Sequence, residues 1–323
     1  MLCAMGEFDL IERFFKRPPR QANVGVGDDC AVWTPREGHQ LALSADMLVE
    51  GRHFLSTVNP VHLGHKSLAV NLSDLAACGA TPQAFLLSLS LPRVDEDWLS
   101  SFTQGLFDLA DAHACELIGG DTTQGPLNIA ITVMGDVPHG QVILRRHAQV
   151  DDDVYVSGFL GDARLALEAF RGAISLHESV FLAARHRLEC PVPRVALGQA
   201  LRGLATAMAD ISDGLVGDLG HILRSSHVGA EIDVSLARRL MATNALWHCP
   251  EDLALNCVFS GGDDYELVFT APPSKAREVQ LAAEMTGTRV TRIGRITAER
   301  GLILRDANGL AVTRALFSFD HFA

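Results

Sequence analysis

Several features that usually identify a protein class are missing from this chain of 323 residues. Its seven cysteines are scattered and none lies in a C-x-x-C pair, which argues against zinc and iron–sulfur sites. The N-terminal stretch MLCAMGEFDLIERFF has no basic segment followed by an apolar run, so we expect no signal peptide, and both Met1 and Met5 are possible starts. Scattered cysteines without a signal peptide are typical of reduced thiols. We therefore expect a cytoplasmic protein.

A basic surface and a long apolar segment are missing too. The formal net charge is -12, whereas binding to nucleic acid or to an anionic membrane needs a basic patch. No stretch approaches the roughly 18 consecutive apolar residues of a transmembrane helix. We expect neither a nucleic-acid nor a membrane partner. Hydrophobic residues still make up 48% of the chain, which is enough to build sizeable cores.

Strand-like and helix-like segments alternate along the chain, with a polar break at RRHAQVDDD (residues 145–153). We place a domain boundary around residues 138–150. The prediction is an α+β protein of two α/β lobes, an N-terminal domain over residues 1–140 and a C-terminal domain over residues 141–323. The predicted strands cover residues 41–46, 84–92, 115–121, 128–137, 154–158, 207–212, 266–270, 289–294 and 302–306. The predicted helices cover residues 60–80, 96–114, 162–170, 195–205, 215–225 and 275–285.

Acidic residues recur where apolar runs end. The stretch GVGDDCAVW places Asp28 and Asp29 directly after a glycine hinge. Two adjacent carboxylates repel each other, so this pair is either an ordinary surface turn or half of a cation site. Strand ends in α/β folds face the crevices where ligands bind. The acids that we expect at or just beyond strand ends are Asp46, Asp121, Asp210 and Asp263.

Asp74 differs because it is predicted inside a helix. It shares a helix face with Asn71 and lies near Lys66, and its apolar neighbours argue against a fully solvated face. Many carboxylates without histidine pairs favour a hard cation, and Mg²⁺ prefers carboxylate and phosphate oxygens. Calcium is the structural alternative, but the chain has no EF-hand loop.

Standard phosphate-binding motifs are not present. GHKS at residues 64–67 is not a Walker A motif, and there is no G-x-G-x-x-G. GGDTTQG at residues 119–125 and SGGDD at residues 260–264 could offer backbone amides to a phosphate, or could be tight turns.

Taken in order, six motifs resemble the thiamine-monophosphate kinase family: GDDCAV, SADMLVEGRHF, NLSDLAACGA, IGGDTT, ISDGL and GGDDYEL. The resemblance covers nearly the whole chain from Met5, including the terminal FDHF. It implies the fold shared with aminoimidazole ribonucleotide synthetase and selenophosphate synthetase. In that fold the mixed sheets of two N-terminal lobes pair into a barrel-like core of a homodimer, and ATP binds near this junction. The implied reaction is phosphorylation of thiamine monophosphate by ATP, the last step of thiamine diphosphate biosynthesis.

The resemblance also implies roles for individual residues, with several Mg²⁺ ions and with ATP as co-substrate. The implied metal ligands are Asp29, Ser44, Ala45, Asp46, Asp74, Asp121, Asp210 and Asp213. Asp46, Asp74 and Asp121 form the implied catalytic set. The implied ATP contacts are Asp29, Gly120, Asp121, Arg145 and Ser212. The implied contacts to thiamine monophosphate are His53, Asp263 and Phe319.

Four positions depart from the family pattern. Ala45 stands where threonine is frequent, so only its main chain can contribute to a site. Asp263 replaces an expected glutamate, which is one methylene longer. His147 and Asp151 stand where glycines are usual, in the loop that follows Arg145.

The implied chemistry agrees with these residue types. A phosphate acceptor has a second pKa of about 6 and is already mostly anionic at neutral pH, so no general base is required. The main obstacle is repulsion between two phosphates, and cations held by aspartates offset it. This favours Asp29 as part of a cation site, whereas Asp28 shapes the turn. Tyr265 and Glu266 are expected to support the site.

Two alternatives stay open at this stage. One is another ATP-using member of the same superfamily, such as a ribonucleotide or selenophosphate synthetase, for which Cys30 is the residue to test. A hydrogenase maturation factor would need a C-terminal cysteine, and this chain ends in DHFA. The other alternative is a nucleotide-binding regulator that does not turn over.

Overall fold

The computed structural model describes residues 6–312, 316 and 318. The chain divides into two compact units, one of Met1–Leu75 with Ala80–Gly140 and one of Ala76–Gly79 with Gln141–Ala323. Each unit builds its own sheet, so the protein is a mixed α/β chain. In the part of the chain that is described, no helix has the length and apolar character needed to cross a membrane.

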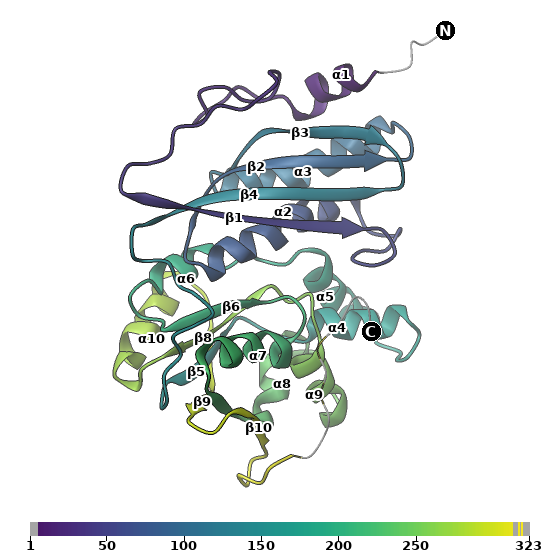
Figure 1. Ribbon diagram of the computed structural model, residues 1–323. Coiled ribbons are helices and arrows are strands. Elements are labelled where there is room, and N and C mark those ends of the chain that lie inside the picture. Colours follow the sequence, from purple (N-terminus) through teal and green to yellow (C-terminus); the bar gives the residue numbers. More distant parts are fainter. Residues whose placement is uncertain (1–5, 313–315, 317, 319–323) are drawn as a thin grey trace. The chain divides into compact units, whose positions relative to one another are not determined.

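The first unit packs two long helices on one face of a four-stranded sheet (Figure 1). It begins with α1 (Glu7–Leu10) and a π-helical turn (Ile11–Phe15). The sheet contains β1 (His39–Val49), β2 (Thr81–Leu91), β3 (Glu116–Gln124) and β4 (Asn128–Pro138), and the helices are α2 (Pro60–Ala77) and α3 (Glu96–Ala112). The strand order is β1-β4-β2-β3, and only β2 and β3 run parallel. The sheet is open, with β1 and β3 as its edges.

The helix-covered face of this sheet carries the core of the unit. Along β2, Leu87 and Leu89 are buried and Ser88 between them is exposed, which is the alternation expected of a strand between a core and an open face. The two helices approach closely at a glycine, because a Cβ on Gly105 of α3 would lie 1.8 Å from the carbonyl oxygen of Val61 in α2. Only glycine permits such an approach.

The second unit is built on a six-stranded sheet of order β10-β7-β9-β5-β8-β6. Its strands are β5 (Asp153–Ser157), β6 (Ala207–Ile211), β7 (Gly229–Asp233), β8 (Glu266–Ala271), β9 (Val290–Thr297) and β10 (Gly301–Arg305). Its helices are α4 (Asp162–Phe170), α5 (Glu178–Glu189), α6 (Val195–Ala200), α7 (Leu215–Ser226), α8 (Ala237–Leu240), α9 (Glu251–Ser260) and α10 (Ala276–Met285). β5, β6 and β8 are buried along their whole length, as continuous apolar runs predict.

Local sequence patterns do not predict α5, β7 or α9, and the helix expected over residues 195–205 ends at Ala200. β7 has only five residues and begins with glycine. Its partners β9 and β10 follow some way along the chain, so its stability comes from pairing that no local pattern reveals.

The expectation that Asp46, Asp121 and Asp263 follow strand ends is wrong. Asp46 lies inside β1 and Asp121 inside β3, while Asp263 precedes β8. Both strands continue because β1 and β3 are sheet edges, where a polar side chain within the strand can still reach solvent. Asp210 does lie near the end of its strand, β6.

Candidate active site

One group of oxygen atoms lies between β1 and α2. Ser44 Oγ donates a hydrogen bond to Asp74, and the backbone N–H of Asp46 donates to Asn71 Oδ1 at 3.2 Å. Ser44 and Asp46 are two residues apart on the strand, and Asn71 and Asp74 are nearly one turn apart on the helix, so all four meet on the helix-covered side. Ala45 between them is exposed. The side-chain atoms named here that could bind a metal are all oxygens, and oxygen ligands suit a hard cation such as Mg²⁺.

A second group surrounds a cavity of about 950 Å³. Gly120 and Asp121 of β3 line one part of it, and Asp28 and Asp29 of the N-terminal segment line another. Asp28 Oδ1 accepts from the backbone N–H of Asp29 at 2.9 Å, so its carboxylate is used in shaping the turn. Asp29 and Asp121 are both exposed to the cavity and offer it carboxylate oxygens.

The N-terminal segment is tied to the sheet by Glu116, at the start of β3. The Glu116 carboxylate is buried and accepts backbone hydrogen bonds from Arg20, Gln21 and Ala22 at 2.6, 3.0 and 3.1 Å. This anchor lies a few residues before Asp28 and Asp29 in the chain. Sequence reasoning missed Glu116, because its partners are backbone groups nearly 100 residues away.

Within one chain the two groups lie at opposite edges of the sheet. Asp46 aligns with Ile131, which aligns with Leu87, which aligns with Gly120. Three strand spacings of about 4.8 Å therefore separate them, or roughly 14 Å. A single ion cannot bridge that distance with direct carboxylate ligands.

His53 lies in the loop after β1, held by its backbone and its ring. Its Nδ1 accepts from the backbone N–H of Val49 at 3.0 Å, and its carbonyl oxygen accepts from Lys66 Nζ at 3.2 Å. A neutral imidazole whose Nδ1 accepts carries its proton on Nε2. The ring of His53 is therefore held in one orientation relative to β1.

In the second unit, Asp210, Ser212 and Asp213 lie at the end of β6 and in the loop that leads into α7. The carboxylate of Asp218, in the first turn of α7, accepts hydrogen bonds from the backbone of this loop. Burial raises the pKa of Asp218 to about 7, while the charge of Arg145 and the backbone hydrogen bonds lower it. The structure therefore places Ser212 and Asp213 together in one loop that Asp218 holds.

Asp263 is joined to the same loop. Its backbone N–H donates to the carbonyl oxygen of Ser212 at 2.9 Å, and that of Tyr265 donates to Ile211 at 2.9 Å. Both Asp263 and Tyr265 have positive φ angles, 67° and 51°. His147 and Asp151 also have positive φ, 91° and 72°, which fits positions where glycine is the favoured residue.

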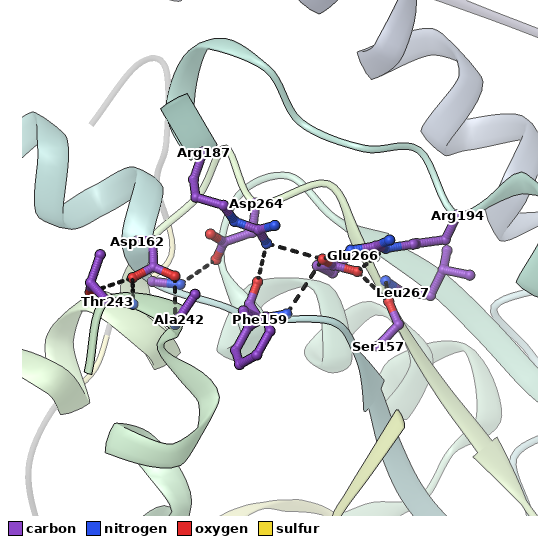
Figure 2. A network of polar contacts seen from close by, with 11 residues as sticks. Ser157, Phe159, Asp162, Arg187, Arg194, Ala242, Thr243, Asp264, Glu266 and Leu267 are labelled. Atoms are coloured by element: carbon purple, nitrogen blue, oxygen red, sulfur yellow. Dashed lines mark hydrogen bonds and ion pairs between the residues drawn. The ribbon is translucent and has the colours of Figure 1, made fainter. Parts of the chain in front are cut away.

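A buried polar network holds Asp264 and Glu266, the residues that follow Asp263 closely in the chain (Figure 2). Glu266 is 1% exposed and accepts from Arg194 at 2.6 Å through both of its oxygens, as well as from Arg187 at 3.1 Å and Ser157 at 2.6 Å. Asp264 accepts from the backbone N–H of Gly161 at 2.8 Å, and burial raises its pKa well above the usual range. The two arginines carry no local signal in the sequence, because their partner lies in a distant strand.

Phe319, the remaining residue expected at the substrate, lies outside the described residues.

Comparison with known proteins finds relatives of the whole chain. Residues 27–137 match the family described as AIR synthase related protein, N-terminal domain, and residues 170–307 match its C-terminal domain. Thiamine-monophosphate kinase of Escherichia coli is 44% identical over 329 residues, which cover 99% of each chain. The enzyme of that name from Haemophilus influenzae is 42% identical over 99% of this chain and 98% of its own.

Comparison with solved structures also finds thiamine-monophosphate kinases. The crystal structure of thiamine-monophosphate kinase from Stenotrophomonas maltophilia has a TM-score of 0.83 and 43% identity, covering 94% of this chain and 95% of that one. A structure described as AaThiL complexed with AMPPCP and TMP has a TM-score of 0.74 and 29% identity, over 90% and 89% of the two chains. The hydrogenase maturation protein HypE of Escherichia coli, at 22% identity and a TM-score of 0.73, shares the fold.

Proposed function

The chain belongs to the thiamine-monophosphate kinase family, and from this membership we propose how its residues carry out the family reaction. That reaction is the ATP-dependent phosphorylation of thiamine monophosphate to thiamine diphosphate. The assignment of this reaction to the chain rests on one observation, the 44% identity over 99% of the chain to an enzyme named thiamine-monophosphate kinase. A related structure described with AMPPCP and TMP supports both ligands. These relatives do not favour a synthetase-like or purely regulatory function.

The metal ligands in this proposal are oxygen donors on both units. In the first unit they are Ser44, Asp46 and Asp74 with the main chain of Ala45, and Asp29 with Asp121; in the second unit they are Asp210 and Asp213. Mg²⁺ bound there would supply positive charge against the repulsion between the acceptor phosphate and ATP. Gly120, Arg145 and Ser212, together with Asp29 and Asp121, contact ATP. The catalytic set is Asp46, Asp74 and Asp121.

The two units have different roles in this proposal. The first, as a domain over residues 1–140, binds metal and ATP and forms a dimer, whereas residues 141–323 complete the ATP and substrate site. A cytoplasmic location is part of the same proposal, supported by scattered cysteines that form no disulfide within the described residues.

His53, Asp263 and Phe319 contact thiamine monophosphate in this proposal. For His53, the contact is supported by its place in the motif SADMLVEGRHF and by the hydrogen bond from the Val49 N–H to Nδ1, which orients the ring. Replacement of His53 by alanine is expected to raise the KM for thiamine monophosphate about tenfold or more, since a hydrogen bond to a charged group contributes roughly 1.5–3 kcal/mol. Steady-state kinetics with the acceptor varied at saturating ATP measures this. A higher KM for ATP alone would assign His53 to the nucleotide instead.

A homodimer is proposed because β1 exposes apolar side chains on the sheet face away from the helices. Leu41, Leu43 and Met47 of β1 are 47%, 64% and 54% exposed on that face. A second copy covering it would form the barrel-like core, and it could bring the β1 edge of one chain near the β3 edge of the other. The two oxygen groups of the first unit would then be completed across chains.

Leu43→Asp tests the dimer face directly. A charge within this apolar surface of β1 should shift the protein from dimer to monomer in light scattering, because the carboxylate would be desolvated. Met285→Asp is the control, since Met285 is 85% exposed on α10 of the other unit. A wild-type protein that is already monomeric would contradict the proposal, as would a dimer that survives Leu43→Asp.

The function itself is tested by product mass. The protein is mixed with ATP, Mg²⁺ and thiamine monophosphate, with free thiamine in a parallel reaction. Thiamine diphosphate and ADP are expected only from the monophosphate. Product from free thiamine, or ATP bound without any product, would exclude the assignment.

A further inference from the structure

One carboxylate in the second unit makes an unusual set of contacts. Three consecutive backbone N–H groups, those of Ser212, Asp213 and Gly214, all point to Asp218 Oδ2, each at 3.1 Å. Asp218 is 4% exposed. Consecutive amides that converge on one point form an anion-binding concavity, and here the anion is a side chain of the same chain.

The position of Asp218 explains why it can reach these amides. It lies in the first turn of α7, where the unpaired N–H groups of a helix start carry partial positive charge. The backbone N–H groups of Ser212, Asp213 and Gly214, just before the helix, are therefore already used inside the protein. What the loop can offer to a nucleotide or a cation is its side chains, Ser212 and Asp213.

The same loop is held from its other side by the Asp263 segment. The backbone N–H of Asp263 donates to Ser212 O, and a Cβ on Gly262 would lie 2.2 Å from that oxygen. The Ser212 carbonyl is thus fixed from one side and its N–H from the other. Removing Asp218 would release three amides from one side while leaving the other side in place.

We infer that Asp218 is a positioning residue, whose carboxylate holds the Ser212–Gly214 loop in the shape that presents Ser212 and Asp213 to ATP and its metal. This inference rests on the proposed function of those two side chains. Asp218 itself touches neither ligand in this assignment.

Asp218→Ala is the main test. It leaves three buried amides without their acceptor, so amide hydrogen exchange of residues 212–214 should become faster in the metal-free protein. Loss of a residue that orients metal ligands is expected to raise the Mg²⁺ concentration for half-maximal activity about 10- to 100-fold. Asp218→Asn keeps an acceptor oxygen of the same reach and should recover most of both properties.

Asp152→Ala is the matched control. Asp152 is also a buried aspartate that accepts from a backbone N–H, that of Gln149, and from Thr206 Oγ1, next to the opposite end of β6. It is expected to lower stability without changing the Mg²⁺ dependence or the exchange of residues 212–214.

The outcomes separate this inference from the proposed function. Unchanged exchange and Mg²⁺ dependence in Asp218→Ala, with activity lost in Asp213→Asn, would overturn the inference alone. Normal activity in Asp213→Asn would overturn the proposed role of the loop, and the exchange data would still decide whether Asp218 shapes it. If Asp218→Ala does not fold, amide exchange in the wild-type protein tests the inference. Rapid exchange of these three amides would contradict the role of Asp218 in holding the loop, and slow exchange would support it.

Discussion

Asparagine in place of Asp121 should lower the rate of thiamine diphosphate formation by at least about 100-fold, since a metal that stabilises developing charge contributes several kcal/mol to catalysis. Asparagine has nearly the same shape as aspartate but lacks the charge. Asp121 is exposed to the cavity and its side chain is not part of the core, so the fold should persist. Steady-state kinetics at several Mg²⁺ concentrations, with thermal unfolding of the same sample, measures both effects.

Asp28→Asn is the control for this result. Asp28 lines the same cavity, but its Oδ1 accepts from the backbone of Asp29, and an asparagine oxygen can keep that bond. Turnover should therefore change little. Near-normal turnover in Asp121→Asn would remove Asp121 from the metal ligands, and equal losses in both variants would point to the total charge of the cavity instead.

The largest effect on stability is expected from Glu266→Ala. Its carboxylate is buried and satisfies Arg194 and Arg187, so its removal leaves two cations without their partner. Breaking a buried ion pair from one side typically costs about 3–5 kcal/mol. The free energy of unfolding, measured by denaturant titration, should fall by that order.

Glu278→Ala provides the comparison for Glu266. Glu278 pairs with Lys275 on the surface of α10, where solvent screens the charges, so the unfolding midpoint should stay where it is. A small loss in Glu266→Ala would mean that the arginines find other acceptors or solvent. Because Glu266 begins the strand that follows Asp263, the KM for thiamine monophosphate should rise in the same variant.

Most elements with a strong local pattern could be predicted from the sequence. β4 and α4 coincide closely with the expected segments, and β2 begins three residues earlier than expected; each has a clear apolar period or run. β7 could not be predicted, because its pairing partners β9 and β10 lie far along the chain. α5 and α9 have weak amphipathic patterns, so local periodicity does not reveal them. The family assignment is confirmed by relatives that cover the whole chain.

In the candidate site, too, some features could be predicted from the sequence and others could not. Ser44, Asp46 and Asp74 were expected together, and the structure does bring Ser44 to Asp74 and Asp46 to Asn71. That Asp121 belongs to a different edge of the sheet was not predictable, since strand order depends on pairing between segments that no local pattern identifies.

By itself, the sequence determined which residue types are available: many carboxylates, no paired cysteines, no basic surface and six ordered motifs. These limit the chemistry to hard cations and phosphates, because oxygen donors and charge are properties of the residues themselves. Only the tertiary structure decided which of those carboxylates face a cavity, as Asp29 and Asp121 do, and which are used within the protein, as Glu116, Asp218 and Glu266 are. The reason is that the sequence does not distinguish an aspartate or glutamate whose oxygens are solvated from one whose oxygens accept hydrogen bonds from backbone amides. Only folding brings those amides and the carboxylate together.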